Sequence, residues 1–375
     1  MSEWNREPIS LVLFFTEGVS LSVWNEVGSL EREIALYKGM QKRGIQVSFV
    51  TYGDRSDLNY ADQLDGIRII CNKWGLPQKW YVRMLPMLLR SVGRRWIGKS
   101  NQTLGADIGL DIAVRAGQKF IARGGYLLSD KSRHKDKPAQ REQALALEKI
   151  VFEGADKIMV TTERIKEQAI EGHELDAQKL RVIPNYVDSE LFAPNADVSK
   201  ENASIIYVGR LKANKNPIAL IEAIRGLRVK LYVVGEGEDE DALREKAADQ
   251  GSEVVFLGRV ANELLPALLN KCILYVQPSF YEGHPKAMIE AMACGLAVIG
   301  ADVAGISDLL KHGDSGYLCG TTAPEIRKAI KILLADKALQ KKLGTNARKH
   351  VEDNFTFERV LNLEMDLLSE VASGK

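Results

Sequence analysis

Short apolar runs recur along the chain, and stretches with helical periodicity separate them. In the first half the runs lie at 9–15 (ISLVLFF), 46–51 (QVSFVT), 67–71, 119–123 and 157–161. In the second half they lie at 204–208 (SIIYV), 230–234 (KLYVV), 254–257, 273–276 and 297–301. Short apolar runs that end in glycine or polar residues are typical of parallel strands whose two faces are both covered. The pattern therefore predicts an α/β fold.

The rhythm is interrupted between residues 185 and 202, where Pro194 and Asn195 lie near charged residues and apolar periodicity is absent. A single core stops growing at roughly 250–300 residues, and the chain has 375. We therefore expect two doubly wound, Rossmann-like domains facing a central cleft, 1–190 and 191–356. A last helix, at 357–373, could pack back on the first domain. Ligands bind at the carboxyl ends of the strands in such sheets, so functional residues are expected where the apolar runs end.

Composition excludes several protein classes. The chain is 45% hydrophobic and 27% charged with a net charge of +1, which does not favour a nucleic-acid binder. The cysteines form no close-spaced pair, so a zinc knuckle or redox motif is not expected and a reducing cytoplasm is the simplest location; they are Cys71, Cys272, Cys294 and Cys319. The start of the chain lacks the pattern of a signal peptide, and no apolar run reaches the ~18 residues of a membrane span.

Two glutamates bracket a Gly-His-Pro in the stretch 281–295, YEGHPKAMIEAMACG. Pro285 suits the first position of a helix and Gly295 suits the position after its end. Glu282 is then expected in the loop before the helix and Glu290 in its second turn. Helix N-termini attract anions, and carboxylates can accept paired sugar hydroxyls. The spacing leaves a second interpretation open, in which Glu282 is a helix-start charge and Glu290 a solvated helix residue.

Four further motifs lie at strand ends. In 208–215, VGRLKANK, Arg210 and Lys215 suit a diphosphate, although each could be a solvated surface base. The others are VIPNYVD at 182–188, VVGEGE at 233–238 and FLGRVANEL at 256–264. Each of these is a weak signal when taken alone.

In this order, the five motifs resemble those of the retaining glycosyltransferase family 4 of the GT-B fold, with its E-x7-E pattern. The resemblance is good over 158–317, weak through the C-terminal helix and thin over the first 150 residues. It implies a metal-independent, retaining, hexosyl-type transfer from a nucleotide diphospho-sugar, with UDP favoured over GDP. The implied acceptor is a glycan or lipid-linked molecule of bacterial-type cell-surface polysaccharide or glycolipid synthesis.

The resemblance also implies roles for individual residues. Arg210 and Lys215 match the basic pair that holds the donor diphosphate, Glu282 the glutamate that binds donor-sugar hydroxyls, and Glu290 the one that binds the ribose. The remaining donor-binding candidates are Gly209, Gly283, His284, Pro285, Arg259 and Val260. His284 stands where Phe is frequent. No cofactor or metal is implied, because no convincing D-x-D pair lies at a strand end and the Arg/Lys pair can neutralise the leaving diphosphate. The acidic residues at 239–241 are interpreted as a solvated helix start.

The first half departs from the family pattern. Many members carry a histidine at a strand end of the first domain, but here no histidine precedes His134, which lies in a basic loop and is interpreted as solvated. In a front-face retaining mechanism the leaving phosphate can take the acceptor proton, so no side-chain base is required. The acceptor-side candidates at the strand ends are Glu17, Gly18, Asn101, Gln102, Arg123, Gly124, Gly125 and Tyr126.

A basic segment lies between Asp65 and Asp107, which contains no acidic residue. Placed on one helix over 79–94, the bases Lys79, Arg83, Arg90 and Arg94 share one side. The other side is expected to hold Trp80, Met84, Leu85, Met87, Leu88, Leu89 and Val92. A basic stripe beside an apolar face suits an anionic membrane surface; alternatives are a packed domain helix with solvated bases, and a site for a soluble anionic or sugar acceptor. Pro86 could split the helix in two.

Rival functions remain open at this point. A nucleotide-sugar epimerase or hydrolase could use the same fold, and a silent binding protein would bind the donor without turnover. A dinucleotide-dependent oxidoreductase would need G-x-G-x-x-G after the first strand, and FFTEGV at 14–19 does not supply it. The expected location is cytoplasmic, with peripheral attachment to the inner face of the cell membrane, and the sequence leaves the oligomeric state open.

Overall fold

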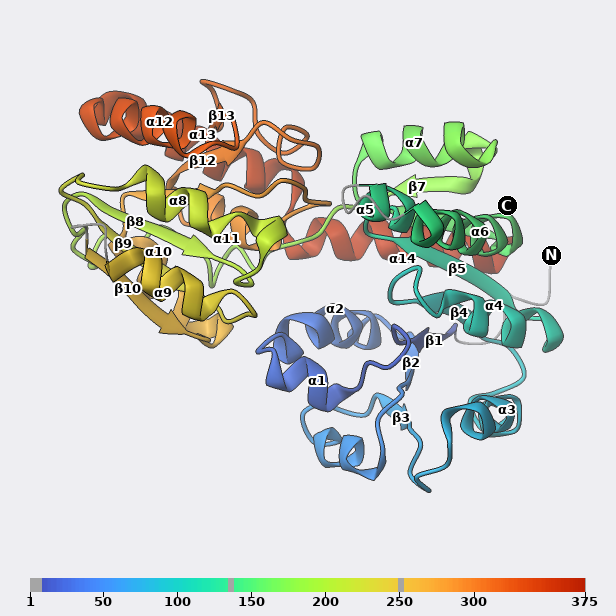
Figure 1. The fold of residues 1–375 in the computed structure, drawn as a ribbon. Helices are drawn as coiled ribbons and strands as arrows, with labels where there is room; N and C mark the ends of the chain where they lie inside the picture. Colours follow the sequence, from blue (N-terminus) through green and yellow to red (C-terminus); the bar gives the residue numbers. More distant parts are fainter. Residues whose placement is uncertain (1–8, 134–137, 249–252, 375) are drawn as a thin grey trace. The chain divides into compact units, whose positions relative to one another are not determined.

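The computed structural model describes residues 9–133, 138–248 and 253–374, so His134 lies outside the described residues. The chain divides into two compact units, 1–184 with 361–375, and 185–360 (Figure 1). The predicted boundary after residue 190 is therefore about six residues late. Asn185 hydrogen-bonds to His284, and Val187 forms a bridge with Thr356, so this segment belongs to the second unit.

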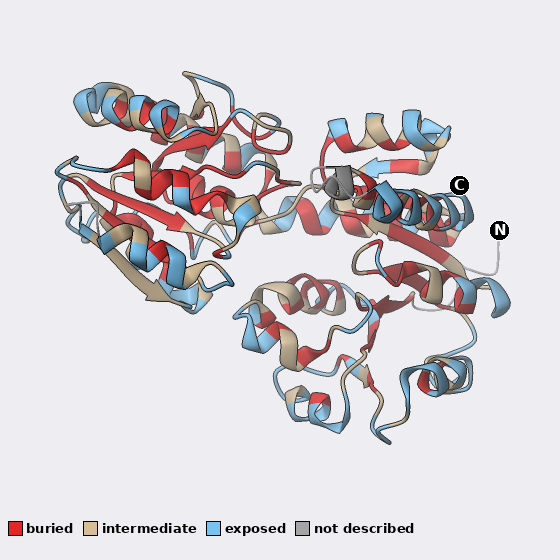
Figure 2. Cartoon of the chain, viewed as in Figure 1, coloured by how far each residue is buried: buried red, intermediate tan, exposed pale blue. Residues whose placement is uncertain are grey.

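The first unit is a seven-stranded sheet in the order β3-β2-β1-β4-β5-β6-β7, and every neighbouring pair is parallel. Its strands are β1 (Ser10–Phe14), β2 (Gln46–Val50), β3 (Arg68–Ile70), β4 (Ile97–Ser100), β5 (Lys119–Gly124), β6 (Lys157–Val160) and β7 (Leu180–Val182). Its helices are α1 (Leu21–Glu26), α2 (Leu30–Lys42), α3 (Gln78–Leu89), α4 (Ala106–Arg115), α5 (Leu128–Arg133), α6 (Pro138–Gly154) and α7 (Glu163–His173). All residues of β1 are buried, as expected for a strand covered on both faces (Figure 2).

The second unit is a six-stranded parallel sheet in the order β10-β9-β8-β11-β12-β13. Its strands are β8 (Ser204–Val208), β9 (Lys230–Val234), β10 (Glu253–Gly258), β11 (Leu274–Gln277), β12 (Ala297–Ala301) and β13 (Tyr317–Cys319). Its helices are α8 (Pro217–Ala223), α9 (Glu240–Ala248), α10 (Leu265–Lys271), α11 (Lys286–Ala293), α12 (Ala323–Ala335) and α13 (Lys337–Asn354). The strands β7 and β13 were not expected, because each is only three residues long and, unlike β3, was not recognised as a separate apolar run.

Helix α11 begins one residue later than the sequence suggested. Pro285 precedes its first residue and accepts a hydrogen bond from Ile289 N, at 3.2 Å, through its carbonyl. Gly295, with φ of 71°, ends the helix as expected. The loop that carries Glu282 is thereby followed by a helix of fixed direction.

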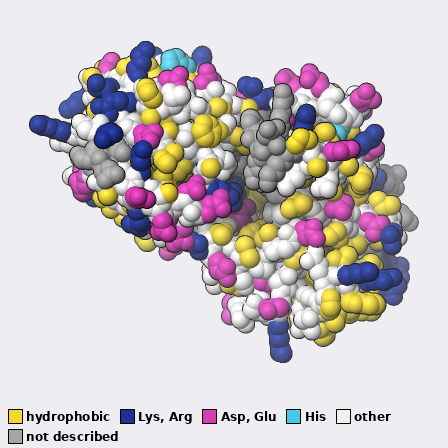
Figure 3. Space-filling view, viewed as in Figure 1, with side chains coloured by type: hydrophobic (Ala, Val, Ile, Leu, Met, Phe, Trp, Pro, Cys, Tyr) yellow, Lys and Arg dark blue, Asp and Glu magenta, His cyan; other side chains and the backbone are white. Residues whose placement is uncertain are grey.

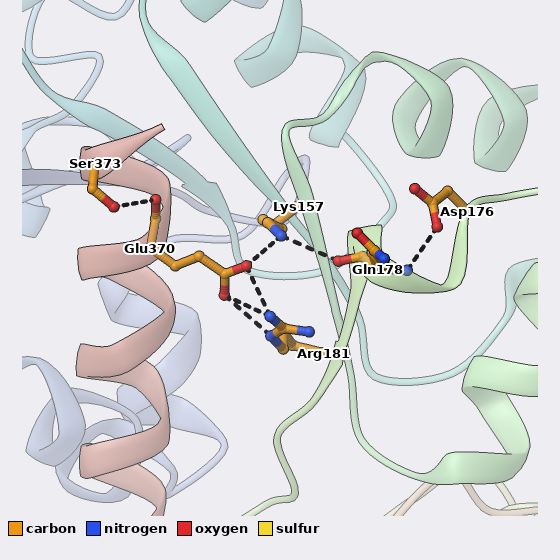
Figure 4. A network of polar contacts seen from close by, with 6 residues as sticks. All are labelled: Lys157, Asp176, Gln178, Arg181, Glu370 and Ser373. Atoms are coloured by element: carbon orange, nitrogen blue, oxygen red, sulfur yellow. Dashed lines mark hydrogen bonds and ion pairs between the residues drawn. The ribbon is translucent and has the colours of Figure 1, made fainter. Parts of the chain in front are cut away.

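The last helix, α14 (Phe357–Ser373), is anchored on strands of the first unit. Lys99 of β4 donates to both oxygens of Glu364 at 2.6 Å, and each side chain is only 1% exposed. Glu370, one helical turn and a half further on, accepts from Lys157 and from Arg181 (Figure 4). Arg181 binds both of its oxygens, at 2.8 and 3.1 Å.

Helix α3 corrects the prediction for the basic segment. It runs through Pro86 without a break but ends at Leu89, so Arg90 caps it and Arg94 lies beyond it. The buried side chains are Tyr81, Leu85 and Leu89, whereas Trp80 and Met87 are 56% and 55% exposed. Trp80 and Met87 therefore share the side of the basic residues, and their predicted position on the opposite, apolar side is wrong.

Two further expectations from the sequence concern membrane-spanning segments and the state of the cysteines. None of the helices in the described ranges combines the length and apolarity that crossing a bilayer requires. All four cysteines carry free thiols, and three of them, Cys71, Cys272 and Cys294, are buried.

Candidate active site

The strand order of the second sheet reverses at one point. β8 is followed by β9 and β10 on one side, and the chain then returns to place β11, β12 and β13 on the other. Ligands bind at the carboxyl ends of the strands on either side of such a point. Arg210 and Lys215 follow β8, and Glu282 follows β11. The three residues with predicted catalytic roles thus lie on both sides of the point where the strand order reverses.

Glu282 lies in a network of buried hydrogen bonds, with only 8% of the residue exposed. Lys215 Nζ donates to Oε1 at 2.6 Å and to Oε2 at 2.7 Å. Gln277 Nε2 and Ser279 Oγ donate to Oε1 at 2.8 and 2.7 Å. Since a carboxylate has about four lone-pair sites, Oε1 is fully used, whereas Oε2 keeps capacity to accept a ligand hydroxyl.

The side chain of Tyr207 is influenced by both Arg210 and Glu282. Its hydroxyl donates to the carbonyl of Arg210 at 3.0 Å. Burial raises the pKa of Tyr207 far above its usual range, the charge of Glu282 adds to this, and the charge of Arg210 opposes it. Both charges therefore act on one phenol at the end of β8. Arg210 itself is exposed and can approach an anion from solvent.

The loops around Lys215 are held by Asn216. Its backbone adopts the left-handed conformation, with φ of 54°. Its side-chain nitrogen donates to Pro278 O at 3.0 Å and to Thr321 O at 2.8 Å. The loops that follow β8, β11 and β13 are thus tied together, which fixes Lys215 opposite Glu282.

Glu290 is 2% exposed, so the interpretation as a solvated helix residue is wrong. Asn262 Nδ2 donates to its Oε1 at 3.1 Å. Burial raises the pKa of Tyr275, and the charges of Glu282 and Glu290 contribute to the same shift. Both glutamates therefore lie near the same buried hydroxyl, although separate donors hold them.

Two glycines of VVGEGE allow close backbone contacts. A Cβ on Gly235, whose φ is +128°, would lie 2.0 Å from Gly209 O, and one on Gly237 would lie 2.0 Å from Leu211 O. Gly235 N also donates to Gly258 O at 2.8 Å. In the sequence this motif is only a weak turn signal, whereas in the structure only glycine fits at both positions.

Arg259 and Val260, the predicted neighbours of the nucleobase, follow β10. Arg259 is exposed and pairs with Glu236 at 2.9 Å, which joins the loops after β9 and β10. Val260 is half-buried and packs on the core of the unit. Both residues lie at the same sheet edge as Glu282.

His284 has a structural environment. Its Nδ1 accepts from Asn185 N at 3.3 Å, and its carbonyl accepts from Asn185 Nδ2 at 2.7 Å. Its ring packs edge-on against Phe355 with centroids 5.1 Å apart. The carbonyls of Glu282 and Gly283 lie against Gly305, where a Cβ would come within 2.2 Å of the former. These contacts fix the shape of the loop.

The acceptor-side candidates gather at the carboxyl edge of the first sheet, where β1 lies beside β4 and the strand order reverses. Arg123 Nη1 donates to Asn101 O at 3.0 Å, and Gly125 N donates to Gln102 Oε1 at 3.3 Å. Glu17 and Gly18, which follow β1, are exposed. Gly124 is buried and Tyr126 half-buried.

Tyr52, at the end of β2, was not singled out from the sequence. Its hydroxyl is buried and has no hydrogen-bond partner among the described residues. Burial raises the pKa of Tyr52, and the charges of Glu17 and Asp107 raise it further. Gln277, Ser279 and Asn262, which donate to the two glutamates, were also not predicted as site residues. In the sequence, only their position near the ends of strands could have indicated them.

Residues 188–350 match the family model described as glycosyl transferases group 1. The chain is 27% identical over 227 residues to N-acetyl-alpha-D-glucosaminyl L-malate synthase of Bacillus anthracis, covering 55% of this chain and 59% of that protein. It is 30% identical over 204 residues to GalNAc-alpha-(1->4)-GalNAc-alpha-(1->3)-diNAcBac-PP-undecaprenol alpha-1,4-N-acetyl-D-galactosaminyltransferase of Campylobacter jejuni, covering 52% and 55%. The chain thus spans less than two thirds of the length of these relatives.

Two solved structures match nearly the whole chain. Sucrose-phosphate synthase from Thermosynechococcus elongatus has a TM-score of 0.82 at 22% identity and covers 98% of this chain and 100% of its own. Anabaena Alr3699/HepE, in complex with UDP and glucose, has a TM-score of 0.78 at 18% identity and covers 96% and 100%. At this identity the similarity shows the fold, two parallel-sheet Rossmann-like units of the GT-B type. The predicted fold of two doubly wound, Rossmann-like units is thereby confirmed, and the family match at 188–350 agrees with the resemblance to glycosyltransferases over that part of the chain.

Proposed function

We propose that this chain, whose residues 188–350 match the group 1 glycosyl transferases, transfers a hexosyl-type sugar from a nucleotide diphospho-sugar with retention of configuration. The observation that carries this is the Lys215–Glu282 pair at the reversal point of the second sheet, flanked by exposed Arg210. The buried carboxylate of Glu282 can accept hydrogen bonds from a sugar, and the two cations beside it can bind the diphosphate to which that sugar is attached.

The donor is bound by this chain's own groups in separate parts. Arg210 contributes a planar fork for phosphate oxygens. Lys215 has three N–H donors, of which Glu282 takes two, so the third can reach a phosphate. Glu282 Oε2 accepts a sugar hydroxyl, and Glu290 with Asn262 binds the ribose. We place the nucleobase against the backbone of Arg259 and Val260, with the phosphates beside Gly209, Gly283, His284 and Pro285.

The transfer is proposed to need neither a metal ion nor a side-chain base. The bond from the anomeric carbon to the phosphate oxygen breaks while the bond to the acceptor oxygen forms on the same face. The acceptor proton moves to the leaving phosphate. Arg210 and Lys215 stabilise the charge that develops on the diphosphate, which is the usual role of fixed cations in such a transition state.

UDP is the favoured nucleotide and GDP the second candidate. Support comes from the fold relative Alr3699/HepE, whose structure contains UDP and glucose. For the acceptor we propose a glycan or a lipid-linked glycan, because the C. jejuni relative is named for an undecaprenol-linked glycan. The role would be cell-surface polysaccharide or glycolipid synthesis in the cytoplasm, with the acceptor held at the edge of the first sheet.

The first step of the test measures binding of UDP-, GDP- and ADP-sugars. The second step measures release of the nucleoside diphosphate with and without a membrane-lipid or glycan extract as acceptor. We expect release that depends on one donor and rises with acceptor. A new nucleotide-sugar, or free sugar at the same rate without acceptor, would instead assign an epimerase or hydrolase. No release with any donor would contradict the proposal.

A further inference from the structure

One face of α3 mixes exposed bases with exposed apolar side chains. At 100° per residue the exposed positions of α3 other than Gln78, together with the capping residue Arg90, fall within an arc of about 120°. They are Lys79, Trp80, Arg83, Pro86, Met87 and Arg90, and we name this set the α3 surface. The same part of the molecule shows hydrophobic and basic side chains side by side in Figure 3, at the lower right.

The opposite face of α3 is firmly attached to the first unit. Tyr81 is 1% exposed, and its hydroxyl donates to the carbonyls of Thr51 and Ile70, at 2.9 Å each. Leu85 and Leu89 are 0% and 2% exposed. Because both apolar packing and hydrogen bonds hold this face inward, Trp80 and Met87 cannot be buried by a simple rotation of the helix.

The aromatic rings of this region carry cations beside them. The Arg83 guanidinium lies 5.6 Å from the centroid of the Trp80 ring. In the loop before α3, Lys73 lies 4.8 Å from the centroid of Trp74, which is 48% exposed. Such pairs present a flat apolar ring and a positive charge together, a combination that suits the boundary between lipid headgroups and acyl chains.

The stretch of sequence that contains the α3 surface carries basic residues and no acidic ones. No acidic residue occurs from 66 to 106. Lys99, which lies in this stretch, forms a buried ion pair with Glu364. Lys79, Arg83 and Arg90, in contrast, are exposed and form no ion pair among the described residues. Their charges are therefore available to an anionic surface.

The α3 surface also lies close to the acceptor edge of the first unit. Gln78, the first residue of α3, donates to Glu17 Oε1 at 2.7 Å, and Glu17 follows β1 at that edge. A lipid surface in contact with α3 would therefore bring a lipid-anchored substrate next to the strand ends.

We propose that the α3 surface binds the surface of a bilayer that contains anionic phospholipids, with Trp80 and Met87 inserted among the headgroups and the three bases opposite lipid phosphates. Charge complementarity selects the anionic bilayer, and the exposed Trp and Met favour it over a nucleic acid, which offers no apolar layer. This goes beyond the proposed sugar transfer and does not depend on the identity of the donor.

The test is sedimentation of the full chain with vesicles, without any sugar donor. Vesicles of phosphatidylcholine alone are compared with vesicles that contain about one-third phosphatidylglycerol, at low and high salt. The charge variant is K79S/R83S/R90S, and the apolar variant is W80S/M87S. The matched control is K331S/K337S/K341S, which removes three exposed lysines from α12 and α13 of the second unit.

We expect the wild type to bind anionic vesicles and to lose binding at high salt. The charge variant should bind about a hundredfold more weakly, since each of the three bases near an anionic surface contributes on the order of fivefold. The apolar variant should bind more weakly at both salt concentrations, and the control should match the wild type. Circular dichroism confirms that each variant is folded.

Three results would overturn the proposal. The wild type could remain in the supernatant with anionic vesicles, or the control could lose as much binding as the charge variant. The third is tighter binding to single- or double-stranded oligonucleotides than to vesicles at the same salt. None of these results bears on the donor panel, so failure here is distinguishable from failure of the proposed sugar transfer.

Discussion

Glu282 and Glu290 show how two carboxylates eight positions apart acquire different chemistry. Glu282 accepts from Lys215, Gln277 and Ser279, and its Oε2, which accepts from Lys215 alone, keeps a lone-pair site available. Glu290 is more deeply buried and accepts from an amide, Asn262. The first is thus paired with a cation next to phosphate-binding groups, and the second accepts a hydrogen bond from a side-chain amide on another loop. These different partners fit binding of different parts of one donor better than paired acid–base work.

Ser279 offers a test of this network that leaves Glu282 itself in place. The variant Ser279→Ala removes one of the donors to Oε1, and a hydrogen bond to a charged group is worth roughly 1.5–3 kcal/mol. We expect kcat to fall about tenfold because Glu282 loses its fixed orientation, and the melting temperature to fall by a few degrees because a buried hydrogen bond is lost. Thr at this position should restore most of the activity, because it keeps the hydroxyl.

Steady-state kinetics on the best donor measures this effect. If Ser279→Ala and Ser279→Thr both turn over like the wild type, Ser279 does not position Glu282.

The sequence predicted which residues matter here but not how they pair. Lys215 and Glu282 were assigned separately to phosphate and sugar, and their direct contact joins positions 67 apart along the chain. That contact depends on β8 and β11 lying side by side, and strand order cannot be read from apolar runs. Gln277 and Ser279 looked like ordinary ends of a strand for the same reason.

At the scale of elements, α14 depends on charged groups for its attachment to the first unit. Lys99 and Glu364 form a pair with 1% of each side chain exposed. Burial lowers the pKa of Lys99, and the charge and hydrogen bonds of Glu364 oppose this shift. Such a pair is sensitive to loss of either member, because the remaining group stays buried without its partner.

We predict that Lys99→Met lowers the free energy of unfolding by about 3–5 kcal/mol, because it leaves the Glu364 carboxylate unpaired. The double variant Lys99→Met/Glu364→Leu should recover most of this loss, since no buried charge remains. Urea denaturation of the wild type, both single variants and the double variant measures the coupling. Strictly additive effects would show that the two side chains do not stabilise each other.

Glu370 gives α14 a second anchor with a pH dependence. Burial raises its pKa, but the hydrogen bonds and charges of Lys157 and Arg181 outweigh this, and the pKa lies below its usual range. A lowered pKa in the folded state stabilises the protein above the pKa of the unfolded carboxyl, about 4.3. This contribution is lost as the pH falls through the folded pKa.

The melting temperature of Glu370→Gln should therefore lie below that of the wild type at neutral pH, and the difference should shrink as the pH falls below about 4. Asp366→Asn is the control, because Asp366 is exposed on the same helix and forms no ion pair among the described residues. A difference that stays constant across acidic pH would refute the role of the Glu370 charge.

Helix α3 shows where sequence reasoning about an element stops. Its existence and its basic positions were predicted, but Trp80 and Met87 were assigned to the packed side because they are apolar. The buried side is instead set by Tyr81 and its hydrogen bonds to Thr51 and Ile70. Residue type alone does not tell which way a helix faces.

For the whole molecule, alternating apolar runs were sufficient to predict two doubly wound units. They were not sufficient to place the boundary, because the segment that begins at Asn185 looks like a linker but hydrogen-bonds to His284. The motifs that carry the resemblance, and the family match at 188–350, both lie mainly in the second unit. Its donor site could therefore be predicted in more detail than the acceptor edge of the first unit, where Tyr52 was missed.

The most direct measurement is a calorimetric titration with whichever of UDP, GDP and ADP binds best, using wild type, Arg210→Ser and Arg228→Ser. Arg228 is exposed just before β9, at the opposite edge of the same sheet, and so controls for charge. We predict one nucleotide per chain, about tenfold or greater loss of affinity for Arg210→Ser, and wild-type affinity for Arg228→Ser. The absence of binding by all three nucleotides, or equal affinity of wild type and Arg210→Ser, would contradict a diphosphate site at the carboxyl edge of the second sheet.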